Sequence, residues 1–474
     1  MENKKTILVI GAGPAGLAAA HEILSKDGSK MVIVVEKEKQ VGGISKTFSY
    51  KDFYFDAGGH RFFTKNEEVE KLWRDSLGDE FLKRNRLSRI FYRGKFYDYP
   101  LKLSNVIKNL GVVESFLVLG SYIKQKFFPY KEENNLEQWI SNRFGKRIFK
   151  HFFETYTEKL WGIPASQVGA DWGAQRIKGL SVSAILKNAL FPQKGRSVIK
   201  TLIESFDYPK YGVGQMYEKI ADNIKKMSGE IWLESAVENF FIENGKISKI
   251  EIFSPAGARI VTVDEVISTM PITDLAEKLS SLKDVAVKEA ARKLKYRSFL
   301  SVCVILDDEK SFPDNWIYIH SKVKMGRIQN FKRWSEFMVP DASKTALGLE
   351  YFCNEGDDLW NMEDKDLIKL GMEELEIVGL GEKKKYLDGF VYRCPKSYPV
   401  YDGDHKKYLA IIKDFLRKFS NLQTVGRNGL FCYNNMDHSI LAGFYAARNV
   451  LSDNRDLDVW QINVDEEYHE EEKI

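Results

Sequence analysis

The chain has few of the residues that build metal centres and disulfide frameworks. Its 474 residues include only four cysteines and seven histidines. The cysteines lie far apart and none has the CxxC spacing of a structural zinc site. We therefore expect no metal ion and no disulfide framework at the functional site. Free cysteines without such a framework favour a reducing compartment, and we predict the cytoplasm.

The chain also lacks a long apolar run and a large charge of either sign. Its most apolar stretch, residues 111–123, is too short to cross a bilayer and contains Glu114. The lysines and aromatic residues of 124–130 would let this stretch rest on a membrane surface, but we expect a buried helix followed by an exposed loop. A net charge of +4, spread along the chain, gives no patch for nucleic acid. We predict a small-molecule substrate, no nucleic-acid partner and no transmembrane segment; a homo-oligomer is compatible with the sequence.

The chain does contain a glycine turn between two apolar runs close to its N-terminus. Residues 7–10 and 31–35 have the composition of buried strands, and residues 11–16 (GAGPAG) with the alanine-rich segment after them form the turn and helix between. The second run ends on Glu36. Strand, glycine turn, helix, strand and terminal carboxylate form the dinucleotide-binding βαβ unit.

Each part of this unit has a physical role. Gly11 permits the tight turn, Gly13 lets the backbone approach a pyrophosphate, and Gly16 lets the helix pack closely on the strand. The N–H groups at the helix N-terminus face the phosphates, and Glu36 can accept hydrogen bonds from ribose hydroxyls. We therefore assign these residues to the dinucleotide: Gly11, Gly13, Pro14, Ala15, Gly16 and Glu36.

A second pair of glycines, Gly42 and Gly43, follows the carboxylate and leads to residues 55–60 (FDAGGH). This pattern resembles FAD-binding proteins of the amine oxidase and protoporphyrinogen oxidase superfamily, although Ile44 stands where those oxidases usually carry arginine. The resemblance implies that the cofactor is FAD rather than NAD. Its further contacts are then expected from residues in four parts of the chain: Lys37, Gly42, Gly43, Val237, Gly426, Met436 and Asp437.

The predicted fold is α/β, with a Rossmann-like FAD-binding domain of the glutathione-reductase type, an inserted helical segment and a second, sheet-containing substrate domain. We expect amphipathic helices over 66–82 and 437–451, the latter with Asp437 as its N-cap, and a hairpin over 91–97. Strands at 237–242, 247–252 and 260–267 would form a meander that returns to the nucleotide sheet. The predicted division is 1–70, 211–270 and 391–452 for the FAD domain, 71–210 for the helical insertion, 271–390 for the substrate domain and 453–474 for an acidic tail.

Five separated segments resemble the UDP-galactopyranose mutase family. In chain order they are 57–62 (AGGHRF), 156–162 (YTEKLWG), 326–328 (GRI), 398–400 (YPV) and 426–437, which begins with GR and ends with YNNMD. The resemblance implies catalytic roles for His60 at the flavin and for Arg327, Arg427 and Tyr433 at a diphosphate. It places four more residues in the substrate cleft: Trp161, Arg176, Tyr398 and Asn435.

The resemblance implies an enzyme that acts on a nucleotide-linked or phosphate-bearing sugar, with N5 of reduced FAD as the nucleophile and no net redox change. The alternative is a flavin oxidoreductase that accepts a hydride from its substrate. The sequence departs from the mutase family at several positions: Asn435 replaces an aspartate, no cleft tyrosine follows Arg176, residues 100–102 lack an asparagine, and 333–390 is longer than in prokaryotic members.

Each of these residues also has an ordinary structural interpretation. An arginine is more often a surface charge than a phosphate ligand. His60 could be a hydrogen-bonded core histidine, and Trp161 could belong to the hydrophobic core without touching a ligand. Arginine nevertheless suits a diphosphate, because its planar fork binds oxygen atoms in pairs and stays charged. An oxidase of apolar substrates would not need such a set of arginines.

Overall fold

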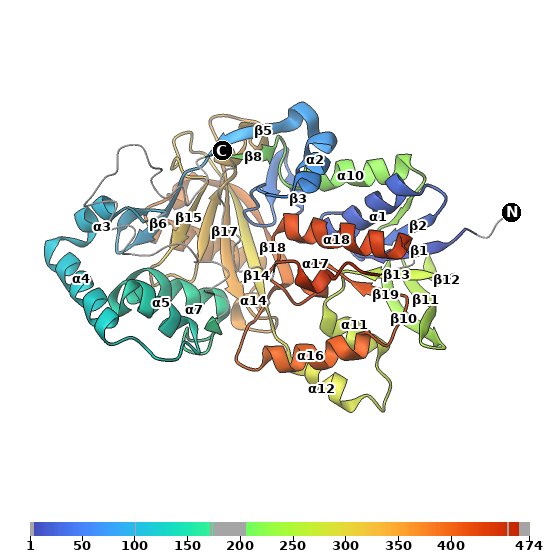
Figure 1. The fold of residues 1–474 in the computed structure, drawn as a ribbon. Helices are drawn as coiled ribbons and strands as arrows, with labels where there is room; N and C mark the ends of the chain where they lie inside the picture. Colours follow the sequence, from blue (N-terminus) through green and yellow to red (C-terminus); the bar gives the residue numbers. More distant parts are fainter. Residues whose placement is uncertain (1–3, 100, 171–172, 174–204, 453–454, 464–474) are drawn as a thin grey trace.

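The computed structural model describes residues 4–99, 101–170, 173, 205–452 and 455–463. The acidic segment 464–474 lies outside the described residues. Two large sheets organise the fold, and Figure 1 shows a helical region beyond them at the left edge. The predicted α/β class, with a parallel nucleotide-type sheet and a second domain that contains a sheet, agrees with this arrangement.

The first sheet is parallel and contains the predicted nucleotide-binding strands. Its five strands lie in the order β19 (Leu422–Thr424), β13 (Glu265–Ser268), β1 (Thr6–Ile10), β2 (Met31–Val35) and β9 (Glu230–Trp232). Both faces are covered, so β1 is apolar from Ile7 to Ile10. Its Ile7 and Val9 pack among the helices α1 (Pro14–Lys26), α10 (Gly214–Lys226) and α18 (Met436–Leu451).

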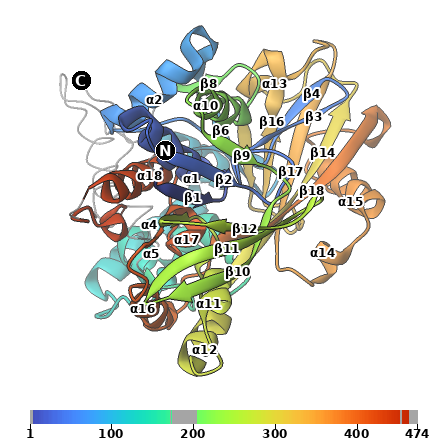
Figure 2. The ribbon, with the colours of Figure 1, turned by 90° about the vertical axis from the view of Figure 1, so that its right-hand side faces the viewer.

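The opposite face of this sheet carries an antiparallel meander and three helices. The meander is β10 (Ala236–Glu243), β11 (Lys246–Ser254) and β12 (Gly257–Thr262), and Figure 2 shows it beside α11 (Ile272–Leu279), α12 (Val285–Lys293) and α16 (His405–Leu416). Asn244 and Gly245, with φ of 51° and 73°, make the predicted hairpin turn. Leu8 and Ile10 of β1 pack on this side.

The second sheet has seven strands and forms the centre of the other half of the molecule. Their order is β18 (Tyr386–Pro399), β14 (Tyr296–Leu306), β17 (Thr345–Cys353), β16 (Arg327–Asn330), β15 (Trp316–Ile319), β6 (Ser88–Tyr92) and β7 (Lys95–Asp98). The helix α15 (Asp364–Ile377) packs its Leu367 and Leu375 against β14 and β17. The hairpin β3 (Thr47–Tyr50) and β4 (Phe53–Asp56) contributes Phe55 to the core shared with the first sheet.

The helical region contains α3 (Leu103–Leu110), α4 (Val112–Phe127), α5 (Leu136–Phe144), α6 (Lys146–Phe149) and α7 (Thr155–Trp161), with a π-helical turn at Lys150–Glu154. Short elements complete the described chain: β5 (Phe81–Asn85) and β8 (Ser205–Pro209), α13 (Phe331–Trp334), α14 (Asp358–Asn361) and α17 (Gly426–Gly429). Within the described residues, no single helix combines the length and apolarity needed to cross a membrane. A bent pair, Ser104–Leu110 with Val112–Phe127 at 119°, meets that test only when its two parts are taken together.

Two predicted elements have different bounds. The helix predicted over 66–82 is α2 (Glu67–Leu77); it ends where Gly78 adopts a φ of 52°, and β5 begins at Phe81. The strand predicted over 260–267 is two strands in different sheets. Between them Asp264 bonds to Thr6 through its N–H and its carboxylate, which moves the chain from the meander to the parallel sheet.

Two further predictions were wrong in a way that matters for function. Asn435, not Asp437, is the N-cap of α18; it shares a capping box with His438 and leaves Asp437 in the first turn. The stretch 111–123 is not buried: only Tyr122 of α4 is, and the apolar face of that helix is exposed.

The division into domains stays a prediction, but the sheets cross two of its boundaries. β6 and β7 come from the range assigned to the helical insertion, yet they complete the seven-stranded sheet. β18 runs from Tyr386 to Pro399, across the boundary placed at residue 391.

Candidate active site

Two glycines of the first turn are required by the fold itself. Gly11 has a φ of 96°, and a Cβ there would lie 2.0 Å from Oγ1 of Thr269. A Cβ on Gly16 would lie 2.0 Å from the carbonyl oxygen of Gly11. Any side chain at either position would therefore displace backbone or a neighbouring strand end, as the βαβ motif predicts.

Gly13 differs, because the protein leaves room for a side chain there. Its backbone is extended, with φ of −81° and ψ of −176°, and a Cβ would meet only Gly43, at an ordinary 3.7 Å. Gly42 holds the second glycine pair against the first turn, because its N–H donates to the carbonyl of Ala12 at 2.8 Å. The backbone of these two segments forms an open cradle around Gly13. A glycine that the fold does not require fits a position over which a ligand passes closely.

The carboxylate of Glu36 is fixed at the end of β2 beside this cradle. One of its oxygens accepts from the N–H of Ala12 at 2.8 Å and the other from the N–H of Glu38 at 3.0 Å. The carbonyl of Glu36 accepts from Ser235, which brings the start of β10 and the buried Val237 next to it. Lys37 is exposed.

The C-terminal segment closes over the same turn. Gly426 has a φ of 82°, and a Cβ there would lie 3.2 Å from Cβ of Ala15. Pro14 and Ala15 open α1, whose first turn contains no acidic residue. Met436 opens α18, whose first turn contains Asp437, so only the N-terminus of α1 combines a positive end with no acidic side chain of its own.

The structure brings His60 together with the two predicted phosphate arginines. Burial, together with the positive charges of Arg427 and Arg327, lowers the pKa of His60 to about 3. Nδ1 of His60 lies 3.1 Å from the carbonyl of Gly58 and donates to it. The imidazole is therefore neutral near pH 7, with an unprotonated Nε2 that can only accept.

Arg427, Tyr398 and Tyr433 form one stacked group. The two phenol rings lie 5.6 Å apart at 14°, and the guanidinium of Arg427 lies 4.7 Å from the ring of Tyr433. Arg427 also donates to the carbonyls of Asn434, at 3.0 and 2.9 Å, and of Ser397, at 3.2 Å. These bonds fix the loop between α17 and α18. All of them go to backbone carbonyls, so none of them pairs the charge of Arg427 with a carboxylate.

Arg327, in contrast, is paired with a carboxylate. Its Nε and Nη2 donate to Glu350 at 2.8 and 2.6 Å, and Gln329 donates to the other oxygen of Glu350 at 2.9 Å. Burial alone would lower the pKa of Arg327, but Glu350 and the surrounding tyrosines together outweigh it and raise that pKa well above its ordinary value. Tyr156 and Tyr398 face the same guanidinium. Glu350 therefore reduces the net positive charge of the cleft.

Replacing Arg327 by alanine should destabilise the protein strongly. The side chain of Glu350 is fully buried, so the substitution would leave an uncompensated charge, at a cost of about 3–5 kcal/mol. Urea unfolding followed by circular dichroism measures this. The double variant Arg327→Met/Glu350→Gln should recover most of the loss, whereas Lys71→Ala, in an exposed pair with Asp75, should cost about 0.5 kcal/mol or less. A loss below about 1 kcal/mol for Arg327→Ala would contradict a buried charged pair.

The other predicted substrate residues lie in different surroundings, and their roles stay predictions. Trp161 is 1% exposed and stacks on Tyr401 at 6.3 Å and 23°, so in the described structure it belongs to the core around α5 and α7. Asn435 is held as the N-cap of α18. Arg176 lies outside the described residues.

Two buried charged residues of the site were missed. Glu350 interrupts the otherwise apolar run of β17, TALGLEYFC, and an isolated carboxylate in a fully buried strand was the signal that could have revealed it. Lys46 is also buried, four residues after Gly42. It supplies a cation close to where the superfamily arginine is replaced by Ile44.

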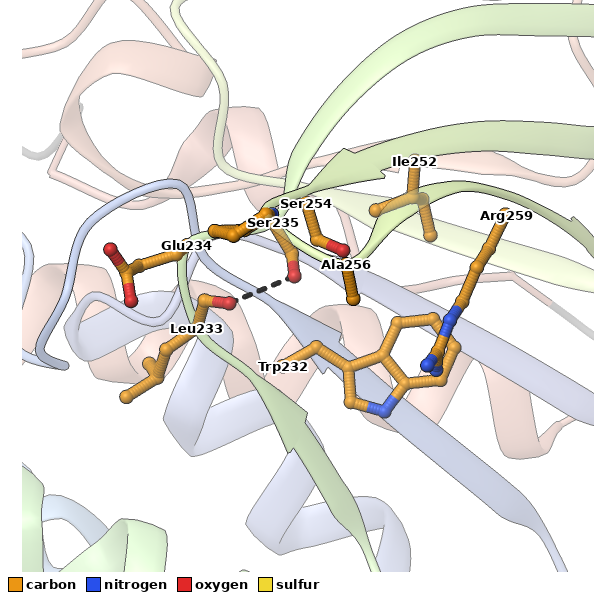
Figure 3. Close-up of a pocket in the computed structure, with 9 residues that line it drawn as sticks. Trp232, Leu233, Glu234, Ser235, Ile252, Ser254, Ala256 and Arg259 are labelled. Carbon is orange, nitrogen blue, oxygen red and sulfur yellow. Dashed lines mark hydrogen bonds between the residues drawn. The ribbon is translucent and has the colours of Figure 1, made fainter.

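A separate open pocket lies at the outer end of the first sheet. Figure 3 shows Trp232, Leu233 and Ser235 on one side and Ile252, Ala256 and Arg259 on the other. The guanidinium of Arg259 lies 5.4 Å from the Trp232 ring. None of the predicted site residues lines this pocket.

Comparison with known proteins identifies the family. A sequence profile described as flavin containing amine oxidoreductase matches residues 14–451. The chain belongs to this family. It is a flavoenzyme, of the mutase or the oxidoreductase type, and its cofactor is FAD. The recognised resemblance is thus confirmed.

Individual relatives are distant and of different kinds. A probable UDP-galactopyranose mutase of Klebsiella pneumoniae is 24% identical over 47% of this chain and 54% of its own length. A 4,4'-diapophytoene desaturase of Methylomonas sp is also 24% identical, over 63% of this chain and 60% of its own length. The matched stretches therefore span less than two thirds of these relatives.

Solved structures resemble the whole fold. The crystal structure of a reduced UDP-galactopyranose mutase superposes with a TM-score of 0.82 at 22% identity, over 98% of both chains. A putative protoporphyrinogen oxidase from Exiguobacterium sp. 255-15 gives 0.72 at 16% identity, over 94% of this chain and 99% of its own. At these identities the likeness shows the fold alone.

The residues present fit FAD. Gly13 leaves an open cradle at the N-terminus of α1, Glu36 offers carboxylate oxygens at the end of β2, and α18 begins beside the same turn. These three features would hold the diphosphate, a ribose and the flavin end. When bound, FAD supplies hydride-accepting or nucleophilic chemistry that the side chains of the chain do not have.

Proposed function

We propose that this flavoenzyme acts on a nucleotide-linked or phosphate-bearing sugar and isomerises it without net oxidation, with N5 of reduced FAD as the nucleophile, as the resemblance to UDP-galactopyranose mutase implies. The observation that supports this best is the grouping of His60, Arg327, Arg427 and Tyr433, which come from four separated parts of the chain: both arginines act on His60, and Arg427 lies against the ring of Tyr433. The four free cysteines support a cytoplasmic location.

The charges suit such a substrate. Two arginines face the cleft, and one, Arg327, is neutralised by Glu350, so a net positive charge stays available for a diphosphate. His60 is neutral and adds no charge, but its Nε2 can accept a hydrogen bond from a sugar hydroxyl. Tyr433 and Tyr398 present phenol groups beside Arg427, where they can bind phosphate oxygen or a sugar ring.

One observation favours a second candidate, an FAD-dependent oxidoreductase that takes a hydride from its substrate. Tyr398 forms an aromatic wall with Phe299, Phe352 and Tyr433, and Glu350 pairs with one of the two arginines of this group. An aromatic wall with little net charge also suits an apolar substrate.

Binding of a nucleoside diphosphate separates these candidates. Arg427→Ala should weaken binding of UDP by about 1.5–3 kcal/mol, roughly 10- to 150-fold, because charge-assisted hydrogen bonds to phosphate are lost. Isothermal calorimetry on the FAD-loaded protein measures this. The matched control is Arg393→Ala, because Arg393 also bonds to backbone carbonyls, those of Trp360 and Met362, and should leave the affinity unchanged. Equal UDP affinity in Arg427→Ala and the wild type would remove the phosphate role and favour the oxidoreductase.

A further inference from the structure

The helix α4 has its polar and apolar faces reversed relative to a helix that packs on a protein core. Three of its polar side chains, those of Glu114, Ser121 and Gln125, bond to the protein: Glu114 receives a hydrogen bond from Arg147 at 2.8 Å and pairs with His151 at 2.7 Å. Ser121 accepts from the N–H of Arg147, and Gln125 donates to Asn142 at 3.0 Å. A surface helix normally buries its apolar stripe instead.

The outward face of α4 is apolar along its whole length. Seven large apolar side chains of α4 are exposed: Val112, Val113, Phe116, Leu117, Leu119, Ile123 and Phe127. Exposure reaches 76% for Val113, 69% for Phe116 and 77% for Phe127, and Phe128 after the helix is 75% exposed. The neighbouring α3 adds Ile107. Contiguous exposed apolar surface of this kind marks a docking surface.

The charge along α3 and α4 is mainly positive, although Asp98, just before α3, pairs with Lys102 and Glu132 follows Lys131. Residues 99–131 contain five lysines, Lys102, Lys108, Lys124, Lys126 and Lys131, and a single carboxylate, Glu114. Glu114 is turned inward to Arg147 and His151, whereas all five lysines are exposed. Figure 1 shows α3 and α4 together at the left edge of the molecule, at the opposite end from α1 and β1.

We propose that α3 and α4 dock the protein on the surface of a bilayer that contains anionic lipid. The apolar side chains of α4 would enter the boundary between headgroups and acyl chains, and the lysines would contact the anionic headgroups. Docking lies in the plane of the membrane, because the 16 residues of α4 span only about 24 Å and the chain bends by 119° at Gly111.

The lysines also distinguish this surface from a dimer interface. Two copies that met symmetrically through α4 would place the same patch on itself and bring Lys124 and Lys126 of both copies together. A membrane with anionic headgroups supplies the missing negative charge, and its hydrocarbon covers the apolar stripe.

Vesicle flotation with the full-length, FAD-loaded protein tests this proposal. The protein should float with vesicles of 70% phosphatidylcholine and 30% phosphatidylglycerol, and bind much less to phosphatidylcholine alone. Phe116→Asp/Phe127→Asp should lower the bound fraction about tenfold or more, and Lys124→Glu/Lys126→Glu should remove most of the dependence on anionic lipid. The matched control is Phe253→Asp. Phe253 is also exposed, but it lies on β11 and not in the helical region, so this variant should bind vesicles like the wild type.

Sedimentation velocity without lipid tests the alternative, in which a second copy of the chain covers the apolar face of α4. A monomer that floats with anionic vesicles, with unchanged FAD content in all variants, supports the proposal. A wild-type protein that stays unbound at low salt would overturn it. A dimer that the Phe116→Asp/Phe127→Asp variant splits into monomers would also overturn it, and would assign α4 to a second copy of the chain.

Discussion

Replacing Gly13 by valine should leave a folded protein that has lost FAD. A Cβ at this position meets only Gly43 at 3.7 Å, and the extended backbone before Pro14 suits a branched residue, so the fold tolerates the change. The same side chain would occupy the surface over which the pyrophosphate passes. We expect affinity for FAD to fall by about 2.7 kcal/mol or more, which is about 100-fold.

Two other glycines serve as controls for this substitution. Gly16→Val should fail to fold, because its side chain would overlap the carbonyl of Gly11. Gly403→Val should keep both fold and cofactor, because no atom lies within 4 Å of a Cβ there. The flavin absorbance of purified protein and its far-ultraviolet circular dichroism give the two readouts. Full FAD content in Gly13→Val would contradict the placement of the cofactor.

The sequence was sufficient for the parts of the fold that depend on local pattern. The strands at 6–10 and 31–35, the glycine turn and the Asn244-Gly245 hairpin are each specified within a few residues, by apolar runs or by backbone conformations that glycine and asparagine favour. The prediction of the FAD site rests on the two strands and the glycine turn, and the prediction of the meander rests on the hairpin.

The features that the sequence did not reveal depend on contacts between distant segments. The exposure of α4 is decided by Arg147 and His151, which draw Glu114 inward; an apolar stretch alone cannot show which way it faces. Likewise, the charge of Arg327 in the cleft depends on Glu350, which is brought beside it only by the pairing of β16 with β17.

The N-terminus of α18 shows the limit of local pattern. Asn435 and Asp437 are both good N-cap residues, and the sequence alone does not choose between them. In the structure His438 completes a capping box with Asn435, so the helix begins at Met436. The position matters because it decides which N–H groups face the cofactor.

The proposed isomerisation predicts an all-or-none dependence on the redox state of the cofactor. A reaction without net oxidation regenerates the flavin in the state in which it began, so one reduction should support many turnovers without oxygen. The oxidised protein lacks the nucleophile and should form no product. An oxidoreductase behaves in the opposite way, because its oxidised flavin must take a hydride from the substrate in every cycle.

The most direct test is therefore anaerobic incubation of UDP-galactopyranose, and of a panel of other nucleotide sugars, with dithionite-reduced and with oxidised protein. Chromatography follows the sugars, and absorbance follows the flavin. The proposed function predicts an isomerised nucleotide sugar from the reduced protein only, in molar excess over the enzyme, with the flavin still reduced at the end. Bleaching of the oxidised flavin by substrate, with no isomerised product from either form, would contradict it.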